Sequence, residues 1–193
     1  MKIAVALFPG VEELDWAGPY EVLALWGRVW PADDVHVFTI AESPEPITCA
    51  NGARVLPTRT WEDAPQIDVL VYPGGRGAVA QLGDERIRNR LRDLSARGTL
   101  MTSVCTGALV YADAGLLEGR AATTHWSALD DLAGFAGVEV RTADRFVDAG
   151  TVVTSSGVSA GIDMALHLVA RLHSLERAQQ IRRQIQYDPE PPV

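Results

Sequence analysis

The stretch LMTSVCTG (residues 100–107) decides the fold of this chain. An apolar strand pattern over residues 100–104 runs directly into a helical pattern, and Cys105 stands between the two. Small residues, Ser103 and Gly107, lie two positions before and after the cysteine. A sharp turn from strand to helix leaves no room for bulky side chains at those positions. The spacing therefore predicts a nucleophile elbow with Cys105 at its tip.

The same order of strand and helix repeats along the chain, outward from this elbow. Short apolar runs predict strands at Ile3–Phe8, Val35–Ile40, Val69–Tyr72, Leu100–Val104, Ala121–Thr124 and Thr151–Ser155. Helical patterns begin at about Pro19 and cover Asp84–Ala96, Thr106–Ala114, Ser127–Phe135 and about Ser159–Leu172. Continuous apolar strands that alternate with helices are typical of a parallel sheet buried on both faces. We expect an α/β fold, a mostly parallel doubly wound sheet with helices on both faces, in one domain (1–193).

Three segments depart from this alternation. Residues 138–154 predict an antiparallel excursion that turns at 148–150, and residues 50–57 predict a short extra strand. The Pro-rich tail 187–193 should be extended, either packed on the surface or lying over a partner subunit. None of these segments predicts a second domain.

The charge balance and composition exclude several classes of protein. The 193 residues include 25 acidic and 17 basic side chains, a net charge of -8, and phosphate binding requires clustered positive charge. The densest basic set, Arg86, Arg88, Arg90 and Arg92, alternates with acidic residues and is typical of a solvated helix face. Since no apolar run approaches about 18 residues and the N-terminus does not resemble a signal peptide, we expect no nucleic-acid or membrane partner.

The two cysteines differ in their sequence context. Two cysteines make no disulfide framework, so a cytoplasmic location is the simplest expectation. Cys105 faces the start of a helix, whose partial positive charge favours the thiolate over the thiol. The alternative is that Cys105 is a small buried packing residue, as many free cysteines are. Cys49 has no comparable context, and we interpret it as an ordinary structural residue.

Two further segments follow predicted strands at the edge of the sheet where ligands bind in such folds. Asp15 lies between Leu14 and Trp16, and burial of its carboxyl would favour a protonated, proton-donating state. The alternative is that Asp15 only caps the next helix. Gly75, in the segment Pro-Gly-Gly (73–75), can bring a bare backbone amide close to an anionic intermediate, although two glycines after a strand are often only a turn.

The four histidines predict no metal site. His167 and His173 lie six residues apart on one predicted helix and so do not share a face. His36 falls within a strand pattern. His125 is the one histidine that we expect near the crevice, where it would support the reacting side chains from behind, or else serve as a structural histidine.

These motifs resemble those of the PfpI superfamily of cysteine-elbow α/β proteins, which have a flavodoxin-like, class I glutamine amidotransferase-like fold. The similarity extends over nearly the whole chain and is strongest to the isonitrile hydratase branch. It rests on Leu7–Pro9, Leu14-Asp15 with Gly18-Pro19, Pro73–Gly75, Ser103–Gly107, Ala122–Trp126, Gly157–Asp163 and Gln184–Tyr187.

The resemblance implies a cysteine-dependent enzyme with no cofactor and no metal, which acts on a small molecule as a homodimer. Cys105 and Asp15 would be the catalytic residues. Substrate would contact Gly75, Thr106, Trp16, Ser156 and Val158, with His125 behind them. The proteases of the superfamily carry histidine where this chain has a threonine after the cysteine, which disfavours peptidase activity. Ser155 and Ser156 replace glycines of the hydratases and should border the crevice.

The expected reaction is the hydration of an isocyanide to an N-substituted formamide by a hydro-lyase mechanism. The Cys105 thiolate would add to the isocyanide carbon, and a proton would arrive by way of Asp15. Two alternatives remain open: a non-enzymatic thiol sensor or ligand-binding module in which Cys105 is oxidised, and glyoxalase or deglycase chemistry on reactive carbonyls. A related domain forms half of many AraC-type regulators, but the net charge of -8 disfavours direct DNA binding here.

Overall fold

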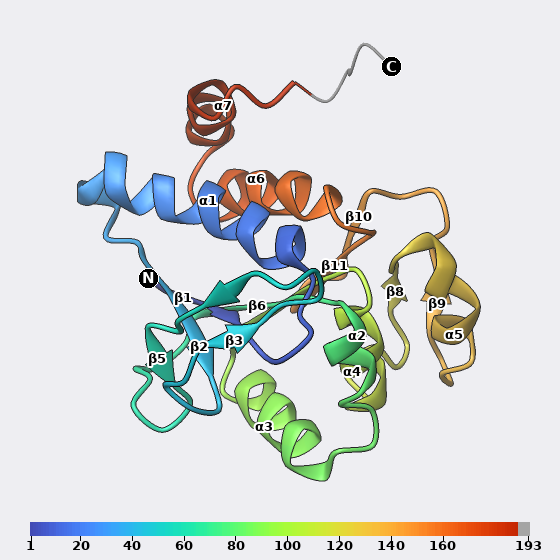
Figure 1. Ribbon diagram of the computed structural model, residues 1–193. Helices are drawn as coiled ribbons and strands as arrows, with labels where there is room; N and C mark the ends of the chain where they lie inside the picture. The colour runs from blue at the N-terminus through green and yellow to red at the C-terminus, as the bar shows by residue number, and fades with distance from the viewer. Residues whose placement is uncertain (189–193) are drawn as a thin grey trace.

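A seven-stranded sheet forms the centre of the computed structural model, which describes residues 1–188 (Figure 1). Its strand order is β10-β11-β7-β6-β1-β2-β5. The strands are β1 (Lys2–Ala6), β2 (His36–Ala41), β5 (Arg59–Thr60), β6 (Val69–Tyr72), β7 (Leu100–Val104), β10 (Phe146–Asp148) and β11 (Val152–Ser155). All neighbours pair in parallel except β10 and β11. The predicted doubly wound α/β fold is confirmed.

Helices cover both faces of the sheet (Figure 1). Helices α1 (Glu13–Val29) and α6 (Ala160–Leu172) lie on one face, and α7 (Leu175–Gln184) packs outside them. The other face carries α2 (Arg76–Val79), α3 (Glu85–Ala96) and α4 (Gly107–Asp113). Each face has its own apolar core, one with Trp26 and Met164 and the other with Leu91 and Tyr111. No helix of residues 1–188 is long and apolar enough to cross a membrane.

The register of the central strands brings their carboxyl ends to one edge. Strands β6 and β7 are buried along their whole length, as expected of strands that are apolar on both faces. Tyr72 lies opposite Ser103, and Ser155 lies opposite Val104. The residues that follow β6, β7 and β11 therefore emerge side by side. The strand order also changes direction at β1, the place where such sheets bind ligands.

The first helix differs from its predicted start. It begins at Glu13 rather than at Pro19, which lies within the helix. Proline has no N–H, so Pro19 leaves one helical hydrogen bond unmade, the one that the Asp15 carbonyl would accept. The predicted boundary was wrong because we interpreted the Gly18-Pro19 pair as a start signal. Asp15 consequently lies in the first turn of the helix.

Of three smaller predictions, one is corrected and two are confirmed. Of residues 121–124 only β8 (Ala121–Ala122) is a strand, and it pairs with β9 (Glu139–Val140) outside the main sheet. Residues 50–57 contain β4 (Arg54–Val55), which forms a separate hairpin with β3 (Ile47–Thr48). The antiparallel turn at 148–150 is present between β10 and β11. The remaining short elements are α5 (Leu129–Ala133) and the 3₁₀ helices η1 (Pro31–Asp33) and η2 (Trp126–Ala128).

The arginines of α3 do not simply face solvent, because several of them bond to neighbouring elements. Arg88 bonds Asp113 through two nitrogen atoms, and Arg92 donates to the Ala114 carbonyl at 2.9 Å. Both contacts fasten α3 to α4. Arg90 lies 4.7 Å over the Trp61 ring and pairs with Glu42. The prediction that these residues do not form a basic binding patch is consistent with these pairings. The tail prediction for residues 189–193 lies outside the described residues.

Candidate active site

Cys105 occupies a strained turn between β7 and α4. Its φ of 56° lies in the left-handed region, which costs a non-glycine residue about 1–3 kcal/mol unless its surroundings hold it there. Three hydrogen bonds do so. The Cys105 amide donates to the carbonyls of Ser155 and Ser156, both at 3.2 Å, and its carbonyl accepts from Thr124 Oγ1 at 2.7 Å. The predicted elbow geometry is present, with Cys105 nearly buried at 6% exposure.

Glycine after the elbow is a steric requirement. A Cβ on Gly107 would lie 2.2 Å from the Tyr72 carbonyl oxygen, because α4 starts directly against the end of β6. The small residue that the sequence pattern demanded is thus explained by close backbone approach.

Asp15 is fully buried against the end of β6. Its Oδ2 accepts a hydrogen bond from the Gly74 amide at 3.0 Å, and its carboxyl lies close enough to the Cys105 thiol for each group to shift the pKa of the other. Oδ1 has no partner among the described residues. Burial raises the pKa of this carboxyl to about 7, and the bond from Gly74 offsets part of that shift. The helix N-cap is Glu12, so the alternative that Asp15 is merely a cap is wrong.

Gly74, rather than Gly75, is the glycine that makes this contact possible. A Cβ on Gly74 would lie 2.6 Å from the Thr106 amide nitrogen and 2.9 Å from Asp15 Oδ2. The Gly75 amide instead donates to Thr106 Oγ1 at 3.0 Å. The Gly75 amide is therefore bonded within the protein. The sequence had predicted that this amide would bind an anionic intermediate, but it is not free to do so. That adjacent pair of glycines carries no sequence signal that distinguishes the two roles.

The thiol does not have the low pKa that the sequence predicted. Burial, followed by the negative charge of Asp15, raises the pKa of Cys105 to about 12. The amides of Thr106 and Val158 act in the opposite direction, as donors to the sulfur, but they do not prevail. The helix dipole has the smaller effect on the pKa of Cys105, because the desolvation of a buried thiolate outweighs it.

Asp15 and Cys105 therefore titrate as one coupled pair. A carboxyl that binds its proton near neutrality lies beside a thiol that binds its proton tightly. Once the first proton is lost, the remaining proton is held between the two groups. The pair can move that proton from sulfur to oxygen without any change in net charge at a buried site.

Val158 and His125 form the wall beside the thiol. Val158 has φ 49°, an outlier for a β-branched residue, and this conformation directs its amide to both Asp15 and Cys105. A Cβ on Gly157 would lie 2.2 Å from His125 Cδ2, so the imidazole ring rests against this glycine. His125 Nδ1 is 2.8 Å from Ser127 Oγ. The histidine thus supports the turn that carries Val158, the position expected for it.

A pocket of about 240 Å³ opens beside this wall. Ser156 and Val158 line it, as the sequence predicted, and the Ser156 carbonyl is hydrogen-bonded to the Cys105 amide. Ser155 does not border the pocket, because it is buried in β11 and its hydroxyl donates to the Ser103 carbonyl at 3.3 Å. The full lining is Thr124, His125, Trp126, Thr142, Ala143, Asp144, Arg145, Ser156, Gly157 and Val158.

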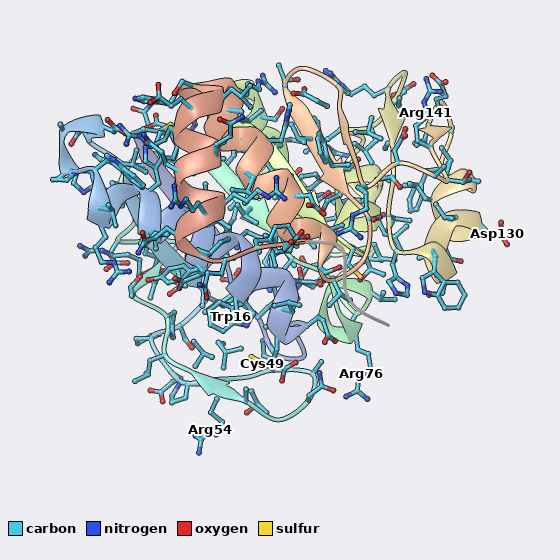
Figure 2. The ribbon with its side chains drawn as sticks, turned by 90° about the horizontal axis from the view of Figure 1, so that it is seen from above. Trp16, Cys49, Arg54, Arg76, Asp130 and Arg141 are labelled. Atoms are coloured by element: carbon cyan, nitrogen blue, oxygen red, sulfur yellow. The ribbon has the colours of Figure 1, made fainter. Side chains whose placement is uncertain are left out.

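Trp16 lies away from this pocket. Its ring packs against Tyr20 in an edge-on contact at 6.2 Å, and it contacts both apolar cores. Its indole N–H lies near the thiol of Cys49 and has no hydrogen-bond partner among the described residues. Figure 2 shows Trp16 and Cys49 near one another at the start of α1. Trp16 does not line this pocket, and Cys49 is a buried packing residue.

The other three histidines each contact a carboxylate. His36 contacts Asp34 at 2.8 Å, and His167 contacts Asp148 at 2.7 Å; His173 lies 3.4 Å from Asp33. Within residues 1–188 no three His, Cys, Asp or Glu side chains are placed to hold a metal ion.

Thr124 is a site residue that the sequence did not reveal. Its side chain is buried and fixes the carbonyl of the strained elbow, yet in the sequence it is simply one of two threonines after a short apolar run. The only indication would have been a hydroxyl residue directly before His125 in a segment that approaches the sheet edge.

We expect Thr124→Val to slow the alkylation of Cys105 by iodoacetamide by about ten-fold, because an unfastened elbow turns the sulfur away from the amides that stabilise its thiolate. Thr99→Val is the matched control. Thr99 is also buried, and its hydroxyl donates to the Ile67 carbonyl at 2.8 Å. It directly precedes β7, at the end of that strand away from Cys105. Both variants should lose about 1–3 kcal/mol of stability. Equal alkylation rates in the two variants would contradict a role for Thr124 in holding the elbow.

Asp15→Asn should make the protein more stable relative to wild type at pH 8 than at pH 5. The folded carboxyl binds its proton up to a pKa of about 7, against 3.8 for an unperturbed aspartate, so its contribution to stability is lost as the pH rises through 7. The advantage of the asparagine variant should grow by about 2–3 kcal/mol between these pH values. Urea denaturation of both proteins measures this, with exposed Asp93→Asn as the control. A difference in stability that does not change with pH would show that the folded protein does not raise the pKa of the Asp15 carboxyl.

Known proteins resemble this chain along its whole length. Isonitrile hydratase of Pseudomonas putida is 40% identical over 192 residues, which cover 100% of this chain and 81% of that protein. The glutathione-independent glyoxalase DJR-1.2 of Caenorhabditis elegans is 27% identical over 180 residues, 91% of each chain. The HTH-type transcriptional regulator CdhR of Pseudomonas aeruginosa is 29% identical over 178 residues, and this chain spans about half of its length (52%).

The solved structures agree with the sequence relatives. A ThiJ/PfpI family protein from Pseudomonas syringae superimposes with a TM-score of 0.88 at 34% identity, over 100% of this chain and 77% of that one. The model of the DJ-1/PfpI family matches residues 1–171, a span that includes Asp15, Cys105 and Val158. The chain therefore belongs to the DJ-1/PfpI family.

Proposed function

We propose that this protein hydrates isocyanides to N-substituted formamides. The observation that carries the proposal is the buried Asp15 carboxyl, which lies beside the Cys105 thiol at a strained elbow next to a small pocket. This pair can take a proton from sulfur and return it to carbon, which is what the addition of a thiol to an isocyanide requires. The similarity to isonitrile hydratase, at 40% identity, supports the same reaction.

In the first step, Cys105 Sγ attacks the terminal carbon of the isocyanide. The thiol proton passes to the ionised Asp15 carboxylate as the S–C bond forms, so the high thiol pKa is not an obstacle. Asp15 then delivers this proton to the same carbon, and the product is a thioimidate, R–N=CH–S–Cys105. Asp15 is left ionised, and no charge has been added to the buried site.

In the second step, water adds to the thioimidate carbon. Asp15 accepts a proton from this water and delivers it to the nitrogen, which gives a tetrahedral R–NH–CH(OH)–S adduct and leaves Asp15 ionised to accept the hydroxyl proton. Loss of the hydroxyl proton and cleavage of the C–S bond release the formamide R–NH–CHO, while sulfur recovers its proton from Asp15. One isocyanide and one water are consumed for each formamide.

The surrounding amides define the position of the reacting atoms. The Gly74 amide fixes Oδ2 of Asp15, which leaves Oδ1 without a partner among the described residues and available for proton transfer. The amides of Thr106 and Val158 point to the sulfur and stabilise negative charge on it during attack and departure. Thr106 Oγ1 is held by the Gly75 amide at 3.0 Å, so its backbone, rather than its hydroxyl, faces the thiol.

A second candidate, glyoxalase chemistry on reactive carbonyls, is favoured by the same thiol–carboxyl pair and by the glyoxalase relative. The sensor alternative is less well supported, because Cys105 is buried and its pKa is raised rather than lowered. We further propose that residues 1–193 act as one catalytic domain, in the cytoplasm and as a homodimer, on a small-molecule substrate without cofactor or metal.

Cys105→Ser should abolish isocyanide hydration, because a serine hydroxyl is a far weaker nucleophile towards carbon at neutral pH. Cys49→Ser removes the other buried thiol and should retain turnover within about two-fold, since it lies outside the site. Formamide production from aryl and alkyl isocyanides, followed by chromatography, measures both, with methylglyoxal as a parallel substrate. Turnover of methylglyoxal but of no isocyanide would reject the proposed reaction in favour of the second candidate.

The value of kcat/KM should rise with pH through about 7, where the pair loses its first proton and Asp15 becomes able to accept the thiol proton. In Asp15→Asn this rise should disappear, and activity should fall by about 10²–10⁴-fold. A pH profile of both proteins between about pH 5 and 9 measures this. A rise near pH 7 that survives in the asparagine variant would assign the titration to another group.

A further inference from the structure

The pocket beside the thiol has one wall that the proposed chemistry does not use. Ser156 and Val158 form its inner side and touch Cys105 through their backbones. The outer side consists of His125 and Trp126 together with residues 142–145, between β9 and β10. A substrate whose reactive carbon reaches the sulfur must therefore place its remaining atoms against this outer side.

The aromatic part of the outer wall is unusually open. Trp126 is 78% exposed, the most exposed of the large apolar side chains, although its neighbours on either side are fixed by hydrogen bonds and core packing. Its ring lies 5.4 Å from that of His125, tilted by 40°. An exposed indole at the mouth of a pocket offers its face to a ligand, and that face attracts cations in particular.

The charges of the outer wall are all paired except one. Arg145 donates to Asp163 at 2.8 Å, and Arg141, which adjoins the wall without lining the pocket, contacts Glu139 at 2.8 Å. Figure 2 shows Arg141 on the outer edge of the molecule, at β9. Asp144 lines the pocket and has no hydrogen bond or ion pair within residues 1–188.

The positive charge of Arg145 is neutralised by Asp163 and held in place by further hydrogen bonds. Asp163 also accepts a hydrogen bond from the Tyr187 hydroxyl at 3.1 Å, and Ser159 Oγ accepts one from Arg145 at 3.4 Å. Arg145 is thus committed to α6 and cannot turn to meet an anionic ligand without breaking these contacts. The pocket presents a free carboxylate next to an exposed indole.

We propose that this outer wall selects substrates whose N-substituent carries a positive charge, such as an aryl group with a quaternary ammonium substituent. The carboxylate of Asp144 and the face of Trp126 attract the cation, while the isocyanide carbon points inward to Cys105. The statement about substrates rests on the proposed isocyanide hydration. The charge preference of the pocket itself does not, because it follows from residues that take no part in the chemistry.

Three unreactive formanilides test the charge preference by binding to the wild-type protein: the parent compound and its para-trimethylammonio and para-carboxylate derivatives. Isothermal titration calorimetry at low ionic strength should show the cation binding about ten-fold more tightly than the anion. The ratio should fall towards one in about 1 M salt, where the Debye length is about 3 Å. Equal binding of cation and anion at low salt, or no binding of the cation at millimolar concentration, would overturn the proposal.

Variants assign the preference to the two residues. Asp144→Asn should abolish most of the ratio, whereas Asp93→Asn, which makes the same change in net charge on exposed α3, should leave it unchanged. Trp126→Ala should weaken binding of the cation, and Trp126→Phe should restore part of it. An equal effect of the two aspartate variants would show that only the net charge of the protein matters.

Measuring the turnover of aryl isocyanides distinguishes failure of the pocket inference from failure of the proposed reaction. If the matching aryl isocyanides are hydrated, kcat/KM should follow the same order as binding, with the cationic substrate first. If none is hydrated while the formanilides retain their order of binding, the pocket inference stands and the proposed reaction fails. If the isocyanides are hydrated without any preference for charge, the reaction stands and the pocket inference fails.

Discussion

The buried contact between the Asp15 carboxyl and the Cys105 thiol is the interaction on which the site depends. A carboxyl that is fully removed from water binds its proton near neutrality, and a thiol beside it resists ionisation. Separately, these shifts would make a weak acid and an unreactive sulfur. Together they make a pair that exchanges one proton at constant charge, which is the form of chemistry that a buried site can perform at little electrostatic cost.

The sheet supplies this pair through its topology. Asp15 follows β1, Gly74 follows β6 and Cys105 follows β7, three strands that are neighbours at the point where the strand order reverses. Close backbone approach then fixes the details, since neither Gly74 nor Gly107 has room for a Cβ. The left-handed conformations of Cys105 and Val158 are the energetic cost of aiming the sulfur and an amide at one another. Such strain persists only where hydrogen bonds such as that of Thr124 hold the turn.

The sequence predicted the architecture well because strand and helix periodicity is a local signal, and the apolar runs of β6 and β7 are short and lie near glycine or proline, which favours strands over helices. The elbow could be predicted for the same reason, because its small residues answer a local steric demand. The burial of the Cys105 thiol, and its effect on the thiol pKa, could not be predicted. The helix dipole suggested a low thiol pKa, whereas the packing of α1 over the elbow desolvates Cys105 and reverses the direction of the shift. Trp16 was placed at the substrate because it adjoins Asp15 in sequence, but consecutive residues of a helix face different neighbours. Thr124 and Gly74 were missed since their roles come from contacts between distant segments.

Direct observation of the covalent intermediate tests the central claim that the Cys105 sulfur adds to the isocyanide carbon with the help of Asp15. The wild-type protein would be mixed with excess aryl isocyanide, quenched in acid within milliseconds and examined by intact-mass and peptide mass spectrometry. Our account predicts a transient mass increase equal to one isocyanide molecule, located on the peptide that contains Cys105 and absent from Cys105→Ser. Formamide release without any such adduct, or an adduct on Cys49 instead, would contradict it.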